Sequence, residues 1–232
     1  MTDADTSHLP HWLEQGGLCA RWMALDGGDM SGLGIALPQV LERAVAKRQG
    51  EYRAGRTCAR AAIDQVSPTS FALDKTDWPI FGPDRAPVWP TGIIGSLTHS
   101  PARVICVAGP ADRYDGLGID IEPAVPPRDS LTLAPRIFCP EELALVEPTS
   151  WAEAGFTLIF SAKEAIYKAV YPTIRRFADF HEVRLAEVSG DDLQFELMPE
   201  MSSDLGQQKT LQVRATWWQG HVLTFCARPG AA

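Results

Sequence analysis

The segment Gly118-Ile119-Asp120-Ile121-Glu122 has the alternating pattern of a β-strand with two different faces. Because successive side chains of a strand point to opposite sides, Ile119 and Ile121 share one face, whereas Asp120 and Glu122 share the other. The two carboxylates are about 6.6 Å apart along the strand, so one cation can lie between them. Oxygen ligands at a partly open site favour magnesium, which retains waters and binds substrate phosphates. The alternative interpretation is a half-buried strand with a solvated acidic face.

Two glycines in the same stretch favour a functional interpretation. Gly116 and Gly118 have no side chain, so they let another chain segment or a ligand approach the strand closely. This possibility reduces the weight of the solvated-face alternative.

A second segment, Phe160-Ser161-Ala162-Lys163-Glu164-Ala165-Ile166-Tyr167-Lys168, is typical of a helix. Positions four apart are neighbours on a helix, so Glu164 and Lys168 lie on one face. Lys163 lies about 100° around the axis and can lean towards the same side. If the two segments converge, three acids and two lysines suit a divalent metal that binds a phosphate ester. The alternative is an ordinary surface Glu–Lys pair, worth about 0.2–0.5 kcal/mol.

A group of basic residues stands out against the acidic background of the chain. The net charge is −8, which argues against general affinity for nucleic acid. Arginine side chains bind phosphate oxygens in pairs, so one arginine stripe suggests a small polyanionic ligand, with a solvated helix face as the alternative. The group lies in a helix predicted from Gln39 to about Ile63 and opened by Pro38, and it contains Arg43, Lys47, Arg48, Arg53, Arg56 and Arg60.

His99 stands at the end of a predicted strand, within Gly95-Ser96-Leu97-Thr98-His99-Ser100. Its neighbours, Thr98 among them, are small and hydroxylated, which suits a phosphate pocket. A lone histidine is more often structural, and this alternative stays open. The other four histidines show no metal-ligand spacing.

The bulk composition is that of a globular protein. Apolar residues make up 45% and charged residues 22% of the 232 residues, enough for one large domain or two small ones. No run approaches the roughly 20 apolar residues that span a bilayer, so we expect no integral membrane segment. The N-terminus lacks the pattern of a signal peptide, which predicts a cytoplasmic protein. The five cysteines have no zinc or redox spacing and are expected to be reduced.

Helix and strand signals predict an α+β fold of two lobes, because a helix followed by strands occurs twice. A loop rich in proline, residues 123–136, joins the two halves. We place the boundary between 1–122 and 123–232. The pattern predicts helices at 39–63, 140–146 and 151–170, and strands at 18–25, 93–98, 104–108, 117–122, 181–188, 193–197, 211–218 and 222–227.

Taken in order, these motifs resemble the 4′-phosphopantetheinyl transferases, in the subgroup that activates enterobactin and surfactin synthetases. The resemblance spans about residues 40–170. It rests on Gly118–Glu122, on Phe160–Lys168, on Ala46–Arg60, which is similar to the N-terminal helix of that subgroup, and on Arg85–Pro90 with Gly95–Ser100.

The resemblance implies a fold, a reaction and a set of roles. The fold is two similar lobes related by a pseudo-twofold axis, each a helix on a mainly antiparallel sheet, with the site in the cleft between them. Coenzyme A donates its phosphopantetheine arm to a serine of an acyl or peptidyl carrier protein, and adenosine 3′,5′-bisphosphate is released. Both halves of the cleft come from one chain, which suggests a monomer.

Each candidate residue has an implied role. Asp120, Glu122 and Glu164 hold Mg²⁺, and Glu164 or a metal-bound water takes the serine proton. Lys163 and Lys168 act as catalytic residues that steady the phosphates. The phosphates of coenzyme A are also bound by Arg48, Arg56, Thr98 and His99, whereas Arg53 and Arg60 either assist or serve only the structure, and Arg85 is a weaker candidate.

Two other functions remain open on the sequence. A metal-dependent phosphohydrolase would use the same acids without a protein acceptor. A non-catalytic module would bind coenzyme A or a carrier protein without turnover. The carrier also remains open, whether from fatty acid, polyketide, nonribosomal peptide or siderophore synthesis.

Overall fold

The computed structural model describes residues 9–67, 79–82, 84, 86–125 and 132–230. Its backbone divides into two compact units, Met1–Tyr114 with Gly230–Ala232 and Asp115–Pro229. The division predicted from the sequence, after residue 122, falls further along the chain, near the end of the strand that follows Tyr114. Among the described residues no helix is both long enough and apolar enough to cross a bilayer.

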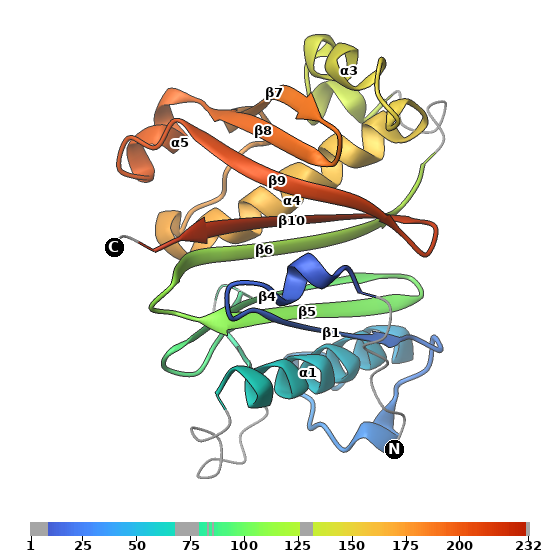
Figure 1. The fold of residues 1–232 in the computed structure, drawn as a ribbon. Coiled ribbons are helices and arrows are strands. Elements are labelled where there is room, and N and C mark those ends of the chain that lie inside the picture. Colours follow the sequence, from blue (N-terminus) through green and yellow to red (C-terminus); the bar gives the residue numbers. More distant parts are fainter. Residues whose placement is uncertain (1–8, 68–78, 83, 85, 126–131, 231–232) are drawn as a thin grey trace. The chain divides into compact units, whose positions relative to one another are not determined.

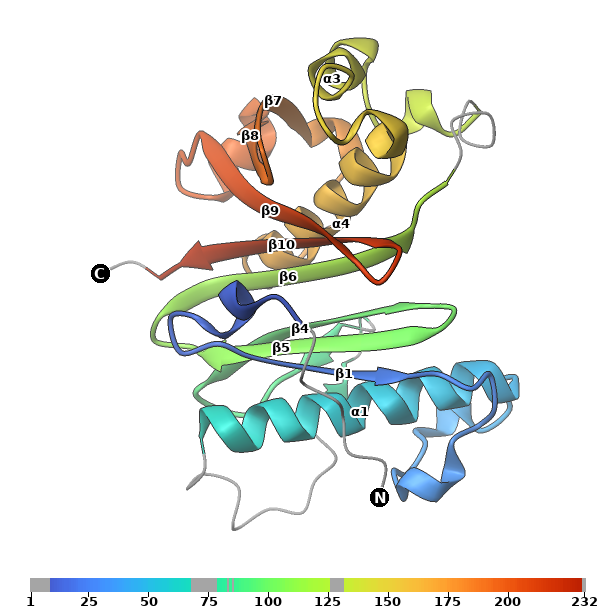
Figure 2. The same ribbon diagram turned by 45° about the vertical axis from the view of Figure 1, so that its right-hand side comes forward.

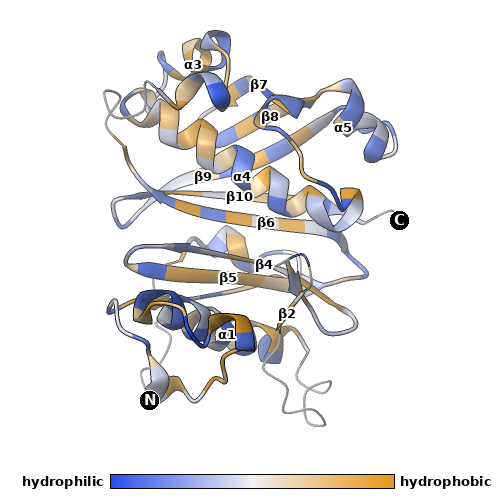
Figure 3. Cartoon of the chain, turned by 180° about the vertical axis from the view of Figure 1, so that it is seen from behind, coloured by the Kyte–Doolittle hydropathy of each residue, from blue (hydrophilic) through white to orange (hydrophobic). Residues whose placement is uncertain are grey.

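The first unit is a helix packed on a three-stranded antiparallel sheet. The strands β1 (Cys19–Ala24), β4 (Ile93–Ser100) and β5 (Arg103–Pro110) lie in the order β1-β5-β4. Helix α1 (Ala46–Val66) lies along one face of this sheet (Figure 1 and Figure 2). The central strand β5 is buried along most of its length and is predominantly hydrophobic (Figure 3).

The core of this unit explains why α1 tolerates its low apolar content. Small buried residues of α1, such as Ala54, Cys58 and Ala62, pack against Val104 and Cys106 of β5. Small side chains let the helix backbone come close to the sheet. Two short strands, β2 (Ile80–Phe81) and β3 (Pro87–Val88), form a separate antiparallel pair.

The predicted start of the first helix is wrong. Residues Gln39–Leu41 form a 3-10 turn, and α1 begins at Ala46, after Val45 in extended backbone. Leu41 and Glu42 are nevertheless tied to the helix, because the Gln49 amide donates to their carbonyls. Val40 and Val45 are 69% and 74% exposed, so the apolar spacing before Ala46 does not mark a buried helix face.

The second unit is a five-stranded sheet covered by helices. The strands lie in the order β6 (Tyr114–Pro123), β10 (His221–Pro229), β9 (Thr210–Trp218), β8 (Asp192–Leu197) and β7 (Val183–Ser189). The last four form an antiparallel meander. Helix α4 (Gly155–Ile174) packs on the sheet with α3 (Pro140–Val146) beside it, whereas α5 (Pro199–Asp204) contacts β8 (Figure 1). Both units thus confirm the predicted α+β class.

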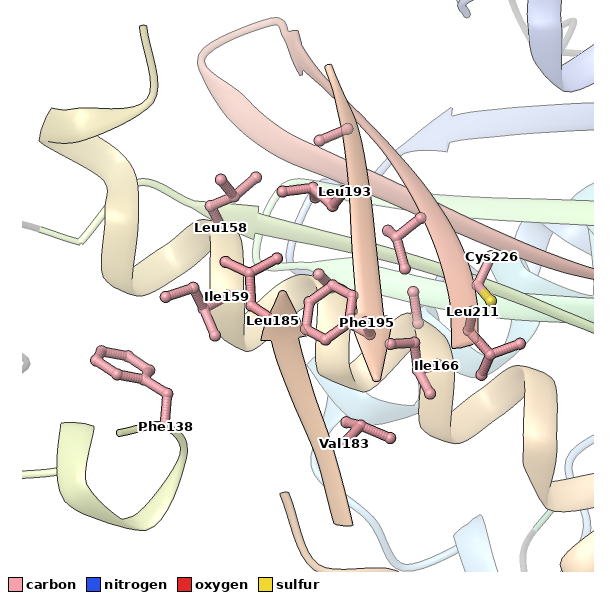
Figure 4. Packing of buried hydrophobic residues seen from close by; sticks show 14 of the residues in the cluster. Phe138, Leu158, Ile159, Ile166, Val183, Leu185, Leu193, Phe195, Leu211 and Cys226 are labelled. Atoms are coloured by element: carbon pink, nitrogen blue, oxygen red, sulfur yellow. The ribbon is translucent and has the colours of Figure 1, made fainter. Parts of the chain in front are cut away.

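The core of the second unit lies between α4 and the meander. Figure 4 shows Leu158, Ile159 and Ile166 of α4 among buried side chains of the strands, including Leu185 and Phe195. The β9–β10 hairpin turns at Gln219 and Gly220, both at positive φ, as a tight two-residue hairpin requires. Helix α4 continues past Pro172, where the sequence predicted its end, and stops two residues later at Ile174.

Strand β6 and helix α4 approach each other unusually closely. A Cβ added at Gly118 would overlap the carbonyl oxygen of Ala165, and one added at Gly116 would overlap that of Ala169. Both alanines are completely buried. The prediction that these glycines admit another chain segment is confirmed, and the segment is α4.

We expect Gly118→Ala to destabilise the protein by about 3 kcal/mol, because the new methyl group meets a backbone atom that cannot move aside. The free energy of unfolding, measured by urea denaturation, tests this. Gly32→Ala is the matched control, since nothing lies within 4 Å of a Cβ at Gly32. Equal stability of the two variants would show that the β6–α4 contact is not as tight as described.

Candidate functional site

Strand β6 and helix α4 bring four charged side chains together in the second unit. We call Asp120, Glu122, Glu164 and Lys168 the acidic cluster. Asp120 and Glu122 follow Gly118 along β6 at two-residue spacing, so they share the face that contains the glycine. The Lys168 ammonium donates to Asp120 Oδ1 at 2.7 Å and to the Ile119 carbonyl at 3.0 Å. The structure thus joins Lys168 of α4 to Asp120 of β6, whereas a shared site of all the predicted residues stays a prediction.

The carboxylates of this cluster lose much of their hydration. Burial, followed by the negative charge of Asp120, raises the pKa of Glu122 to about 7, and Lys168 opposes this rise. Burial also raises the pKa of Glu164, with a further contribution from Asp120 and an opposing one from Lys168. Three acids thus share one poorly solvated region, and such a region favours a bound cation.

The donor set fits magnesium, although the side chains do not surround a metal position. Three carboxylates provide the hard oxygen atoms that magnesium prefers. As placed, no group of three or more acidic, histidine or cysteine side chains in the described part of the chain is arranged to hold a metal ion. Asp120 Oδ1 is instead bonded to Lys168. The three-carboxylate magnesium site stays a prediction.

Lys163 does not join this cluster, which corrects its expected place beside the phosphates. Its side chain is 0% exposed, and its ammonium pairs with Glu142 Oε1 at 2.8 Å. The same ammonium donates to the carbonyls of Ile137 at 2.8 Å and Phe180 at 3.1 Å. An ammonium has three hydrogens, so these acceptors use all of them. Lys163 is therefore a structural residue, and burial lowers its pKa while Glu142 opposes that effect.

Glu142 was missed by the sequence analysis, although it organises this region. Its buried carboxylate accepts from the backbone N–H groups of Cys139 and Leu185 and from Lys163. It links α3, β7 and α4 in one network. A local signal existed: Pro140 and Glu142 follow Cys139 in the pattern of a helix start with an acid at its third position.

Ser161 also has a structural explanation. Its hydroxyl lies 2.8 Å from that of Thr224 on β10, and the Thr224 hydroxyl donates to the Ser161 carbonyl at 2.9 Å. Both residues are completely buried. This pair fastens α4 to the sheet one turn before Glu164.

An apolar pocket of about 120 Å³ opens beside Glu164. It lies where α4 meets the start of β7 and the preceding 3-10 turn, Phe180–Glu182. Its lining includes Glu164, Tyr167, Phe177, Phe180, Val183 and Met201.

The basic candidates lie in the first unit. Arg48 on α1 donates to Glu51 at 3.1 Å and lies 3.2 Å from His99 Nε2 at the end of β4. His99 is 43% exposed at its side chain, whereas the preceding residue, Thr98, is buried. Two of the predicted phosphate ligands, Arg48 and His99, are thus neighbours on the surface of this unit.

Arg56 is an unusual buried cation. It is 6% exposed, its Nε is buried without a hydrogen-bond partner, and its guanidinium stacks over the Tyr52 ring at 4.4 Å. Burial lowers its pKa, and Tyr52 opposes this effect. The role of Arg56 as a phosphate ligand stays a prediction.

The remaining arginines separate into different roles. Arg53 donates to the carbonyls of Ile35 and Asp29, so it fastens the segment before α1. The contacts of Arg53 are therefore structural, which is one of the two roles that the sequence left open for it. Arg60 is exposed on α1, and Arg85 lies outside the described residues. That the basic residues of one unit and the acidic cluster of the other line one cleft stays a prediction.

Comparison with known families assigns both parts of the chain to one class of transferases. Residues 37–109 match the 4′-phosphopantetheinyl transferase N-terminal domain, and residues 116–226 match the 4′-phosphopantetheinyl transferase superfamily. The chain belongs to this family.

Several curated proteins are similar to this chain, and two of the following three are designated 4′-phosphopantetheinyl transferases. A 4′-phosphopantetheinyl transferase of Nocardia iowensis, Npt, is 33% identical over 147 residues, 63% of this chain and 62% of that protein. PptT of Mycobacterium tuberculosis is 36% identical over 148 residues, 63% and 61% of the two chains. Enterobactin synthase component D of Salmonella typhi is 27% identical over 180 residues, 77% and 70%. The chain spans about three fifths of the length of the first two.

Similar solved structures were also found, and one of them is the following. A holo-[acyl-carrier-protein] synthase of Neisseria meningitidis aligns with 51% of this chain and 99% of its own, at 23% identity and a TM-score of 0.39. No inference rests on this similarity.

We expect Lys163→Met to destabilise the protein by about 3 kcal/mol or more, because it leaves the Glu142 carboxylate buried without its counter-charge. Urea denaturation measures the change. Arg214→Met, which breaks the exposed pair with Asp192, is the control and should cost less than about 1 kcal/mol. If Lys163→Met is as stable as this control, Lys163 is not the structural residue described.

Proposed function

We propose that this protein transfers the 4′-phosphopantetheine arm of coenzyme A to a serine of an acyl or peptidyl carrier protein, releasing adenosine 3′,5′-bisphosphate. The observation that supports this most is the acidic cluster, formed by the two segments that define the family resemblance. Transfer of a phosphoryl group depends on neutralising charge and orienting the nucleophile. The carboxylates of the acidic cluster, which can hold a cation, and the partly exposed Lys168 are the candidates for these tasks.

Asp120, Glu122 and Glu164 are the proposed ligands of Mg²⁺. When bound, magnesium would neutralise charge on the diphosphate and polarise it as a Lewis acid. Glu164 would accept the proton of the carrier serine, and burial raises the pKa of its carboxyl, which makes the ionised form a stronger base. This assignment explains why three acids are kept together in a poorly hydrated region.

Lys168 is the proposed phosphate-binding lysine. Its side chain is 26% exposed, in contrast to that of Lys163. Two of its three hydrogens are donated to Ile119 and Asp120, and the third is proposed to bind a phosphate oxygen. Lys168 would thus bind both Asp120 on β6 and a phosphate group of coenzyme A.

The other parts of coenzyme A have candidate positions of their own. The pantetheine arm is uncharged and combines two amides with methyl and methylene groups, and the apolar pocket beside Glu164 is the proposed position for part of it. Arg48, Arg56 and His99 are the proposed ligands of the 3′-phosphate and diphosphate, because guanidinium groups bind phosphate oxygens well. Thr98 is buried beside His99 and is the least direct candidate.

A transfer assay tests the proposed activity. The purified chain is mixed with coenzyme A, magnesium chloride and a panel of apo carrier proteins from fatty acid, polyketide, nonribosomal peptide and siderophore synthesis. Mass spectrometry should show the gain of one phosphopantetheine group, which is lost with EDTA and in carriers whose acceptor serine is alanine.

The other outcomes separate the alternatives. Unmodified carriers across the whole panel would contradict the proposal. Release of phosphate or pantetheine phosphate without a carrier would identify a phosphohydrolase. Binding of coenzyme A with no magnesium-dependent turnover would identify a non-catalytic module.

We expect Glu164→Gln to lower turnover by at least about 100-fold, because the amide cannot accept the serine proton. Glu153→Gln, at an exposed position just before α4, is the control and should keep full turnover. Thermal unfolding of both variants should match the parent protein. Near-normal turnover of a folded Glu164→Gln variant would show that Glu164 is neither base nor metal ligand.

A further inference from the structure

One cysteine has surroundings that differ from those of the other four. All five cysteines belong to the described residues and are free thiols. Cys19, Cys58, Cys106 and Cys226 are buried, whereas Cys139 is partly exposed. Cys139 directly precedes α3 and is not part of the acidic cluster. Cys139 is therefore the cysteine whose thiol is most accessible to a reagent in solution.

The Cys139 thiol lies beside a histidine whose orientation is defined. The Sγ atom is 3.9 Å from His181 Nδ1, a distance within hydrogen-bond range for sulfur, and His181 Nε2 is 3.1 Å from the Pro135 carbonyl oxygen. A carbonyl oxygen can only accept, so Nε2 holds the hydrogen in that bond. The lone pair of neutral His181 is then on Nδ1, facing the thiol.

This arrangement is the one that activates a nucleophile. The thiolate, and not the thiol, attacks electrophiles. A base within reach of the nucleophile, itself oriented by a third group, promotes formation of the reactive form. Here the base is His181 and the orienting group is the Pro135 carbonyl. His181 is exposed, so the pair is open to solvent on the side of the imidazole.

Both residues are also held by the backbone around them. The N–H of Cys139 donates to Glu142 Oε2 at 2.9 Å. The N–H of His181 donates to Asp179 Oδ1 at 2.9 Å, and the Asp179 N–H donates to Glu182. The pair is thus preformed in the folded protein.

We propose that Cys139 and His181 form a reactive thiol site that exchanges with small disulfides. The thiol proton passes to His181 Nδ1, and the Cys139 sulfur attacks one sulfur of the disulfide R–S–S–R. The R–S–S–R bond breaks as the Cys139–S–S–R bond forms. The leaving RS⁻ takes the proton from His181, so no other oxidant or reductant is needed.

The buried cysteines provide an internal contrast. Burial raises the pKa of Cys58 and of Cys226 to about 12 and that of Cys106 well above its usual value. Burial also raises the pKa of Cys19, whose thiol donates to Gln65 at 3.3 Å. These four thiols are both shielded and disfavoured as thiolates.

The test uses the folded full chain and oxidised glutathione as the probe. We expect one adduct to form first, by intact mass, and peptide mapping to place it at Cys139. Cys139→Ser should abolish this fast adduct. His181→Ala should slow it by at least about tenfold, and His221→Ala, a histidine on β10, should leave the rate unchanged.

Peptide mapping of the adduct on the parent protein needs no variant, so it tests the assignment to Cys139 even if a variant fails to fold. A first adduct on any other cysteine would overturn the proposal, as would a fast adduct that persists in Cys139→Ser. An unchanged rate in folded His181→Ala, checked by circular dichroism, would overturn the role of the histidine. Because no transferase assay is involved, these outcomes are independent of the proposed function.

Discussion

The close contact between β6 and α4 determines where the chemistry of the second unit lies. Gly116 and Gly118 have no side chain on the face of β6 that meets α4, and α4 presents Ala165 and Ala169 at the same places. Backbone therefore packs against backbone, and the strand cannot slip by one residue without losing this fit. The next positions of β6 on that face are Asp120 and Glu122. The same packing that excludes side chains at the glycines thus places two acids beside Lys168 and Glu164.

A second constraint is the buried ion pair between Glu142 and Lys163. It joins α3, α4 and β7 through one carboxylate that also accepts two backbone N–H groups. Breaking such a pair is costly because a charge is left in a poorly hydrated interior. Lys163 therefore orients α4 against α3, whereas Lys168 contacts Asp120 and the Ile119 carbonyl of β6 and stays partly exposed. Two lysines of one motif thus have different surroundings.

The two units have complementary chemistry, and the family matches follow the same division. The N-terminal match, 37–109, lies within the first unit, and the superfamily match, 116–226, lies within the second. The first unit presents Arg48, His99 and the buried Arg56, whereas the second contains the acidic cluster. Each unit has its own hydrophobic core, so each can hold its charged residues in place by its own packing.

Much of the local structure was predictable from the sequence because it depends on short-range patterns. Alternation placed Asp120 and Glu122 on one face of a strand, and the extent of α3, Pro140–Val146, was predicted correctly. The start of α1 was not, because Val40 and Val45 extend the apolar spacing of the helix although both are exposed and Gln39–Leu41 form a 3-10 turn.

Such short-range patterns could not predict the surroundings of a charged side chain. Nothing in Phe160–Lys168 indicates that Lys163 is buried and Lys168 partly exposed, since both positions suit a helix equally well. The difference arises from Glu142 and from the carbonyls of Ile137 and Phe180, which come from other elements. The sequence by itself determined which residue types lie on which face of each element. Only the tertiary structure decided which charges are neutralised inside the protein, because that depends on groups brought together from distant parts of the chain.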